Sequence, residues 1–171
     1  SNNSMALEGQ PQLDLLHLVF LMIQLDGEPG FINMNAARKR RENMEGVNPC
    51  GEILLDSKQQ CNLTTVNLCA FRGAEDFDLE GAKKAQALSA RAGMRMTLID
   101  LELPEWNEKH KRDRLTGCSL TGVQDAFAGF TRQEQDEHLA ALSGAAREAA
   151  DEYAHQLRIP SALLVTTIKP E

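Results

Sequence analysis

The sequence is 171 residues long, with 42% hydrophobic and 25% charged residues, and its formal net charge is -7. These values are typical of one globular domain with its own core, and the negative charge argues against binding to a nucleic-acid backbone, whose phosphates would repel it. The most apolar run, 13–25, is interrupted by polar residues and is too short to cross a bilayer, and no signal peptide is recognisable. We therefore expect a cytoplasmic protein that binds neither nucleic acid nor membrane and handles any nucleotide as a small ligand.

Hydrophobic periodicity and turn residues predict alternating strands and helices, an α/β architecture. A polar loop is expected at 1–11, and a helix at 12–26 is apolar nearly all round, which predicts burial on most sides. Gly27-Glu28-Pro29-Gly30 ends this helix. The elements expected after it are an extended stretch at 31–34, a helical turn at 35–42, a tight loop at 46–55, a strand at 61–71, a helix capped by Asp78 that runs to Met96, a helix after Pro104, a strand at 115–120, a helix at 121–128, a helix behind the capping box of Thr131 and Glu134 that runs to Leu157, and a strand at 162–168.

The segment Asn48-Pro49-Cys50-Gly51-Glu52 indicates chemistry most directly. Pro49 and Gly51 favour a tight loop that displays Cys50, and in an extended loop side chains two residues apart point the same way. An amide, a thiol and a carboxylate would then face one ligand. The amide can orient a hydroxyl, the carboxylate can accept a proton, and the thiol can act as a nucleophile, a redox group or a hydrogen-atom donor. The residues alone do not choose among these roles, or between them and a turn with an incidental cysteine.

The segments 48–55 and 61–67 together resemble the finger loop of ribonucleotide reductases. The resemblance implies Cys50 as the transient thiyl radical that takes the 3′-hydrogen from the ribose of a nucleotide. It implies Asn48 as a ligand of the ribose hydroxyls and Glu52 as the general base at the 3′-hydroxyl.

The same resemblance implies a fold, a fragment of a ten-stranded α/β barrel with the finger loop at its centre. Residues 1–171 would then be part of a single catalytic barrel domain. Because the apolar run 162–165 expects cover on both faces and the chain stops soon after it, and because the first residues resemble a segment inside the barrel, we expect a chain cut at both ends.

Two further segments resemble parts of the family that supply the reducing electrons and bind the substrate phosphates. Cys61, eleven residues after Cys50, stands where adenosylcobalamin-dependent reductases place one of the two cysteines that reduce the 2′-carbon and become a disulfide; its partner lies upstream in the family. Lys169, Pro170 and Glu171 resemble the start of the loop that grips substrate phosphates, which implies that they bind substrate.

The resemblance as a whole implies reduction of ribonucleotides to deoxyribonucleotides, with adenosylcobalamin as the cofactor and a thioredoxin-like reductant as a partner. The Lys169-Pro170-Glu171 ending favours triphosphate substrates. We expect the fragment alone to be inactive. Two alternatives stay open: the catalytic subunit of a di-iron-dependent ribonucleotide reductase, against which the eleven-residue cysteine spacing argues, and a non-catalytic truncated barrel fragment.

The other reactive or charged groups have ordinary interpretations. The four histidines share no ligand spacing, so no metal site is expected. Cys69 and Cys118 are expected to be buried or partly buried thiols. The basic run Arg38-Lys39-Arg40-Arg41 could steer a phosphate, but a solvated turn is the favoured interpretation.

Overall fold

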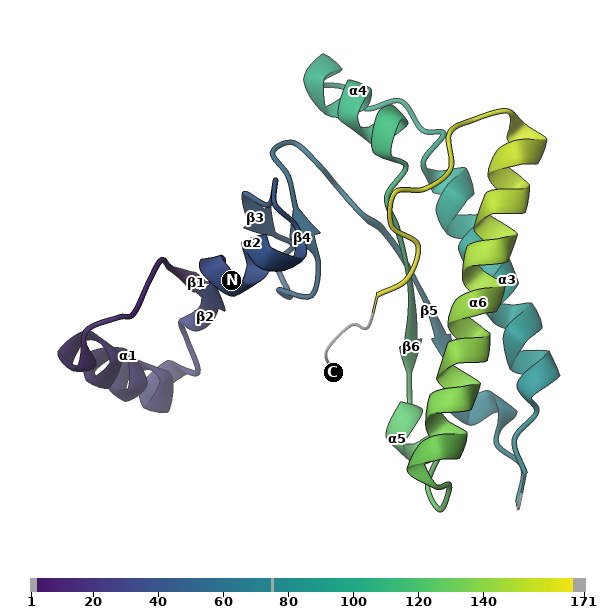
Figure 1. The fold of residues 1–171 in the computed structure, drawn as a ribbon, viewed down its shortest axis with the longest axis horizontal. Coiled ribbons are helices and arrows are strands. Elements are labelled where there is room, and N and C mark those ends of the chain that lie inside the picture. The colour runs from purple at the N-terminus through teal and green to yellow at the C-terminus, as the bar shows by residue number, and fades with distance from the viewer. Residues whose placement is uncertain (1–2, 75, 168–171) are drawn as a thin grey trace. The chain divides into compact units, whose positions relative to one another are not determined.

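The computed structural model describes residues 3–74 and 76–167 (Figure 1). Helices alternate with paired strands, which confirms the α/β class. The chain divides into two compact units, one ending at Ser57 and the other beginning at Lys58. In the described ranges, no helix has the length and apolar character needed to cross a membrane.

Within residues 3–57, the first unit shows two helices and two small sheets. Its elements are β1 (Ser4–Leu7), α1 (Leu13–Asp26), β2 (Gly30–Asn33), α2 (Met34–Arg40), β3 (Gly46–Val47) and β4 (Leu54–Leu55). β1 and β2 are parallel, whereas β3 and β4 form an antiparallel hairpin. The expected polar loop at 1–11 is therefore wrong over β1, because that strand is stabilised by pairing with a segment distant in the sequence.

A small core attaches the hairpin to α2. The buried side chains of Met34, Ala37 and Met44 pack together, and Val47 from β3 and Leu54 from β4 pack against them. The side chain of Asn33 caps α2 by accepting a hydrogen bond from the Ala36 N–H at 3.0 Å. Apolar burial and this cap hold the loop between β3 and β4 on a defined base.

Helix α1 is correctly predicted in extent, but the burial expected for it is wrong. It ends at Gly27, which has a φ of 75° and donates its N–H to the Ile23 carbonyl at 2.8 Å. Only Val19 is buried among its described residues, and Leu13 and Leu25 are 82% and 83% exposed. An apolar sequence predicts that a helix prefers cover, but it does not say which surface provides the cover.

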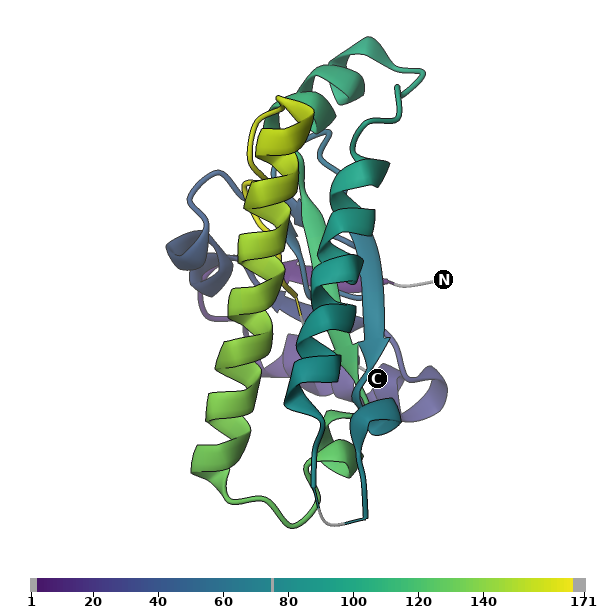
Figure 2. The same cartoon turned by 90° about the vertical axis from the view of Figure 1, so that its right-hand side faces the viewer.

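The second unit is a sheet with two long helices on one face (Figure 2). Its elements are β5 (Asn62–Asn67), a 3-10 turn (Leu68–Phe71), α3 (Leu79–Met96), α4 (Pro104–Asp113), β6 (Thr116–Thr121), α5 (Val123–Ala126) and α6 (Arg132–Leu157). β5 and β6 are parallel along their whole length. Small buried residues, including Ala90 on α3 and Ala146 and Ala150 on α6, let the two helices pack closely over β6.

Local signals located the helices of this unit well. Asp78 caps α3 by accepting from the Gly81 N–H at 2.8 Å, and Thr131 and Glu134 form the expected capping box of α6. The strand expected at 162–168 is only partly formed where it is described. Its backbone hydrogen-bonds to β6, for example from the Cys118 N–H to the Val165 carbonyl at 2.8 Å, but the regular pairing is a single bridge between Cys118 and Thr166.

Candidate active site

Cys50 lies on a β-turn at the tip of the β3–β4 hairpin. The Gly51 N–H donates to the Asn48 carbonyl at 2.9 Å, which closes the turn from 48 to 51, and Pro49 occupies the second position, where its fixed φ is favourable. Gly51 has a φ of 82°, a conformation that glycine adopts without steric cost. The thiol of Cys50 is exposed. The prediction of a tight loop that displays this cysteine is confirmed.

Asn48 has a structural role in this turn. Its side-chain oxygen accepts a hydrogen bond from the Ile53 N–H at 2.9 Å, and its own N–H donates to the Ile53 carbonyl at 3.2 Å. These bonds join the two sides of the loop just above the strands. The loop is thus a closed turn and not the extended segment that the simple alternation argument assumed.

Glu52 lies in a different environment from the neighbouring thiol. Both of its carboxylate oxygens are buried, and neither has a hydrogen-bond partner among the described residues. Cys50 and Glu52 nevertheless line the same pocket, which has a volume of about 620 Å³ and is bounded also by residues of β1, β2 and α2. Buried polar groups in native proteins are nearly always paired, so an unpaired carboxylate beside a pocket indicates a place for a ligand with a hydrogen to donate.

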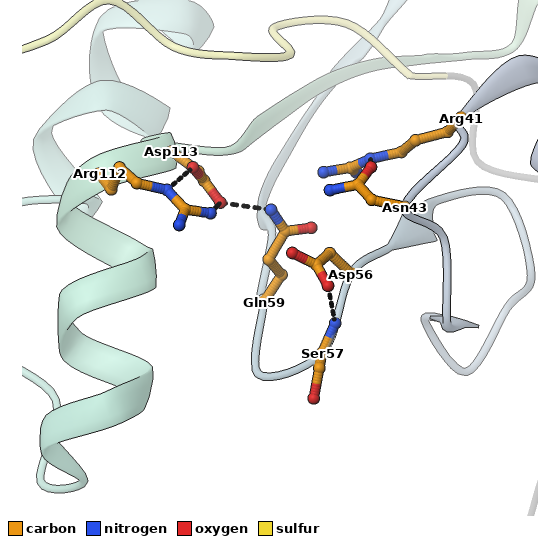
Figure 3. Close-up of polar contacts among 7 residues, drawn as sticks. All are labelled: Arg41, Asn43, Asp56, Ser57, Gln59, Arg112 and Asp113. Atoms are coloured by element: carbon orange, nitrogen blue, oxygen red, sulfur yellow. Dashed lines mark hydrogen bonds and ion pairs between the residues drawn. The ribbon is translucent and has the colours of Figure 1, made fainter.

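Arg41 contacts strand β4 and the side chain of Asn43, and Figure 3 shows the Arg41 and Asn43 side chains next to each other. Its guanidinium donates to the Leu54 carbonyl on β4, and its Nε approaches the Asn43 side-chain oxygen at 3.4 Å. A bond from a charged group to a backbone carbonyl is stronger than a neutral one. The turn that carries Cys50 therefore stands on a hairpin held by backbone pairing, apolar burial and an arginine.

Cys61 belongs to the second unit, where both of its neighbouring segments are anchored. On one side, the buried Gln59 donates to Asp113 at the end of α4, and Arg112 holds the same carboxylate with two bonds of 2.6 and 2.9 Å (Figure 3). On the other side, the side chain of Asn62 donates to the Leu115 carbonyl at 3.1 Å. The chain is thus anchored on both sides of the Cys61 thiol.

Gly117 on β6 provides the space in which the Cys61 sulfur lies. A Cβ atom at Gly117 would be 3.1 Å from the Cys61 sulfur, 3.0 Å from a Thr167 methyl and 2.5 Å from a Leu63 methyl. Each value is shorter than an ordinary contact of about 3.5–4.0 Å. Glycine at this position is therefore explained by the close approach of neighbouring side chains to the strand.

The two remaining cysteines differ from each other. Cys118 is 1% exposed, and burial raises the pKa of its thiol, so it has the inert character expected of a core cysteine. Cys69 is exposed, with its thiol donating to the Gly122 carbonyl at 3.5 Å, so the expectation of burial is wrong there. Cys69 lies in the short 3-10 turn after β5, where the neighbouring Leu68 is buried.

The remaining site residues are the predicted phosphate-binding segment and two residues near Cys61 that were not predicted. Lys169, Pro170 and Glu171, predicted to bind substrate phosphates, lie outside the described residues. Sequence reasoning did not identify Gln59 or Gly117 as residues that position Cys61. The sequence offered one signal for Gln59, which is that two glutamines directly precede the predicted strand. Its partner Asp113 is distant in the sequence, and no local pattern links the two residues.

Comparisons with known proteins identify the family of the chain. Residues 4–157 match the family model of the ribonucleotide reductase barrel domain. The adenosylcobalamin-dependent ribonucleoside-triphosphate reductase of Lacticaseibacillus paracasei is 34% identical over 138 residues, which are 74% of this chain and 18% of that protein. The enzyme of the same name from Lactobacillus leichmannii is 29% identical over 141 residues, 73% of this chain and 18% of that protein.

A solved structure supports the same fold. The crystal structure of a B-12 dependent (class II) ribonucleotide reductase superimposes with a TM-score of 0.75 at 24% identity, and the match covers 97% of this chain and 27% of that one. The chain therefore spans about a fifth of the length of the curated relatives that it matches.

Proposed function

The chain belongs to the ribonucleotide reductase barrel-domain family, and on this premise we propose that it is the radical-bearing part of an adenosylcobalamin-dependent ribonucleotide reductase. The enzyme reduces ribonucleotides, preferably triphosphates, to deoxyribonucleotides in the cytoplasm. In the complete protein this chain forms part of one ten-stranded catalytic barrel, and the turn 48–51 is the tip of its central finger loop. The names of the relatives support the cofactor and the substrate class.

One observation carries the proposal: an exposed thiol and an unpaired, buried carboxylate line one pocket. Cys50 supplies the thiol and Glu52 the carboxylate. The pocket volume of about 620 Å³ lies within the range of small-ligand sites. A nucleotide sugar presents hydroxyl groups that can satisfy the carboxylate while a C–H bond of the same ring faces the sulfur.

Each residue then has a defined task. As a thiyl radical, Cys50 takes the 3′-hydrogen of the ribose and later returns a hydrogen to that carbon. Glu52 accepts the proton of the 3′-hydroxyl, and because its oxygens are shielded from water in the free protein, no competing hydrogen bond has to be broken first. Asn48, whose side-chain oxygen already accepts from Ile53, meets a ribose hydroxyl through its amide hydrogens.

Reduction of the 2′-carbon needs two electrons, for which we propose Cys61 and a second cysteine outside this chain. The 2′-hydroxyl leaves as water and a C–H bond takes its place, while the two thiols give up two electrons and two protons and form a disulfide, which a thioredoxin-like dithiol reduces by exchange. The anchoring of Gln59 and Asn62 on either side of Cys61 supports this role, because a disulfide forms only when the two sulfurs reach a narrow range of positions.

Adenosylcobalamin fits this chain at the exposed thiol. When bound, the cofactor supplies the radical that removes the thiol hydrogen of Cys50. The exposure of Cys50 at the tip of a turn is what such a transfer requires. The pocket beside it is lined by the Glu52 carboxylate, which can accept a hydrogen bond from a sugar hydroxyl, so we assign the pocket to the substrate.

Substitutions in the full-length protein test the proposal. Cys50→Ser is expected to abolish deoxyribonucleotide formation, because a hydroxyl does not form a comparable radical, and Glu52→Gln should lower turnover by about 10²–10⁴-fold through loss of the base. Cys61→Ser should stop multiple turnover with a dithiol reductant. Cys69→Ser is the matched control, since Cys69 is also exposed but has no role in the proposal. Normal turnover by Cys50→Ser would exclude the assignment, and activity without added adenosylcobalamin would favour the di-iron alternative.

A further inference from the structure

The basic run 38–41, at the C-terminal end of α2 and its cap, does not act as a single charged patch, because its members have different surroundings. Arg38 pairs with Glu8 at 2.7 Å, and Arg41 binds the Leu54 carbonyl inside the hairpin. Arg40 is the member of this run that lines the pocket containing Cys50 and Glu52. Lys39 and Arg40 are both exposed, but Lys39 does not line that pocket.

From this arrangement we propose that Arg40 binds a phosphate group of the nucleotide whose ribose occupies the pocket at Glu52. The inference rests on the proposed function and adds a substrate-binding residue to it. Arginine is suited to phosphate oxygens because its planar guanidinium presents several N–H donors in a fixed geometry.

The distribution of charge supports this assignment. The chain carries a formal net charge of -7, so this part of the protein presents an unfavourable field to a polyphosphate unless a cation lies close by. At physiological ionic strength charges further away than about 8 Å are largely screened, and the cation must therefore lie in the pocket wall. Arg40 has this position.

The neighbouring acid strengthens the argument. Glu52 and Arg40 line one pocket, yet the carboxylate oxygens have no hydrogen-bond partner among the described residues. The two charges are thus kept apart instead of neutralising each other. A ligand that carries hydroxyl groups at one end and an anion at the other satisfies both, which is the chemistry of a nucleotide.

The test measures steady-state kinetics of the full-length protein with ribonucleoside triphosphate as the probe. Arg40→Gln is expected to raise KM about tenfold with little change in kcat, as the loss of one charge-assisted bond to phosphate implies. Arg40→Lys should restore part of the affinity, because the charge returns without the planar geometry. Lys39→Gln is the matched control, one residue away on the same helix, and should leave KM unchanged.

Three outcomes would overturn the inference. The first is that Arg40→Gln has the same KM as the parent protein. The second is that Lys39→Gln raises KM by the same factor as Arg40→Gln, which would show only a general effect of charge. If Arg40→Gln raised only the half-saturating concentration of adenosylcobalamin, whose nucleotide tail also carries a phosphate, Arg40 would bind the cofactor and not the substrate. Cys50→Ser, measured in parallel, separates this inference from the proposed function: if that variant is inactive while Arg40→Gln is normal, only the role of Arg40 fails.

Discussion

Replacing Gly117 with alanine should impair the reaction proposed for Cys61 without removing any reactive group. The added methyl would be 3.1 Å from the Cys61 sulfur, 3.0 Å from a Thr167 methyl and 2.5 Å from a Leu63 methyl. To restore contacts of about 3.5–4.0 Å, Leu63 must shift by about 1 Å and the other two groups by about half that distance. Leu63 is 37% exposed, so its terminal methyl can rotate toward solvent at little cost.

The shift at Cys61 is the consequential one, because the backbone on both sides of this residue is anchored. Gln59 is tied to Asp113 and Asn62 to Leu115, so the strain falls on the Cys61 side chain and on strand β6. Overpacking of this kind costs about 1–3 kcal/mol of stability. A displacement of about half an ångström in a reacting group should lower turnover about tenfold, given that 1 Å can cost about a hundredfold.

The assay compares Gly117→Ala with Gly144→Ala in the full-length protein. Gly144 lies within α6, and a Cβ there meets no atom within 4 Å, so alanine should raise stability by about 0.5–1 kcal/mol and leave turnover unchanged. Thermal melting, steady-state turnover with a dithiol reductant and the rate of Cys61 alkylation are measured for both. The reasoning is refuted if Gly117→Ala melts at a lower temperature but retains normal turnover and the normal alkylation rate.

Two further predictions concern stability. His110 is buried, and desolvation, followed by the charge of Arg114, lowers its pKa below 6.5; the unfolded chain then binds a proton that the folded chain does not, so stability should decline as pH falls below about 6.5. His110→Gln should flatten that decline in urea unfolding between pH 7 and 5, and an unchanged slope would contradict the cause. Leu142→Ala, at a fully buried position of α6, should cost about 2–5 kcal/mol. Leu88→Ala, 68% exposed on α3, should cost far less, and equal losses would show that burial does not decide the difference.

The parts of the fold that the sequence predicted are those set by local chemistry. Asp78 and Thr131 cap their helices in the structure because the side-chain oxygen and the N–H it binds are three residues apart. β1 was missed because a strand of four residues gains its stability from β2, which follows a whole intervening helix. The burial of α1 was mispredicted for the same reason: cover is a non-local property.

In the candidate site, too, the features set by local chemistry were predicted and those set by distant elements were not. Pro49 and Gly51 predicted the turn and the display of Cys50, since both act through their own backbone conformations. The burial of Glu52 and the place of Arg40 in the pocket wall depend on β1, β2 and α2, which contribute most of that wall. No pattern within the segment 48–52 contains this information.

The contrast between the two central groups is consistent with the proposed chemistry. A thiol that must first lose a hydrogen to an external radical has to be reachable, and Cys50 is exposed. A carboxylate that must accept a proton from a sugar hydroxyl benefits from a site without competing water, and the oxygens of Glu52 are shielded. Shielding an unpaired carboxylate is unfavourable for the free protein, and the turn retains it because three backbone-directed bonds at Asn48 and Gly51 fix the chain around it. The rigid turn therefore keeps the carboxylate unpaired in the free protein, and the substrate supplies the missing hydrogen bond.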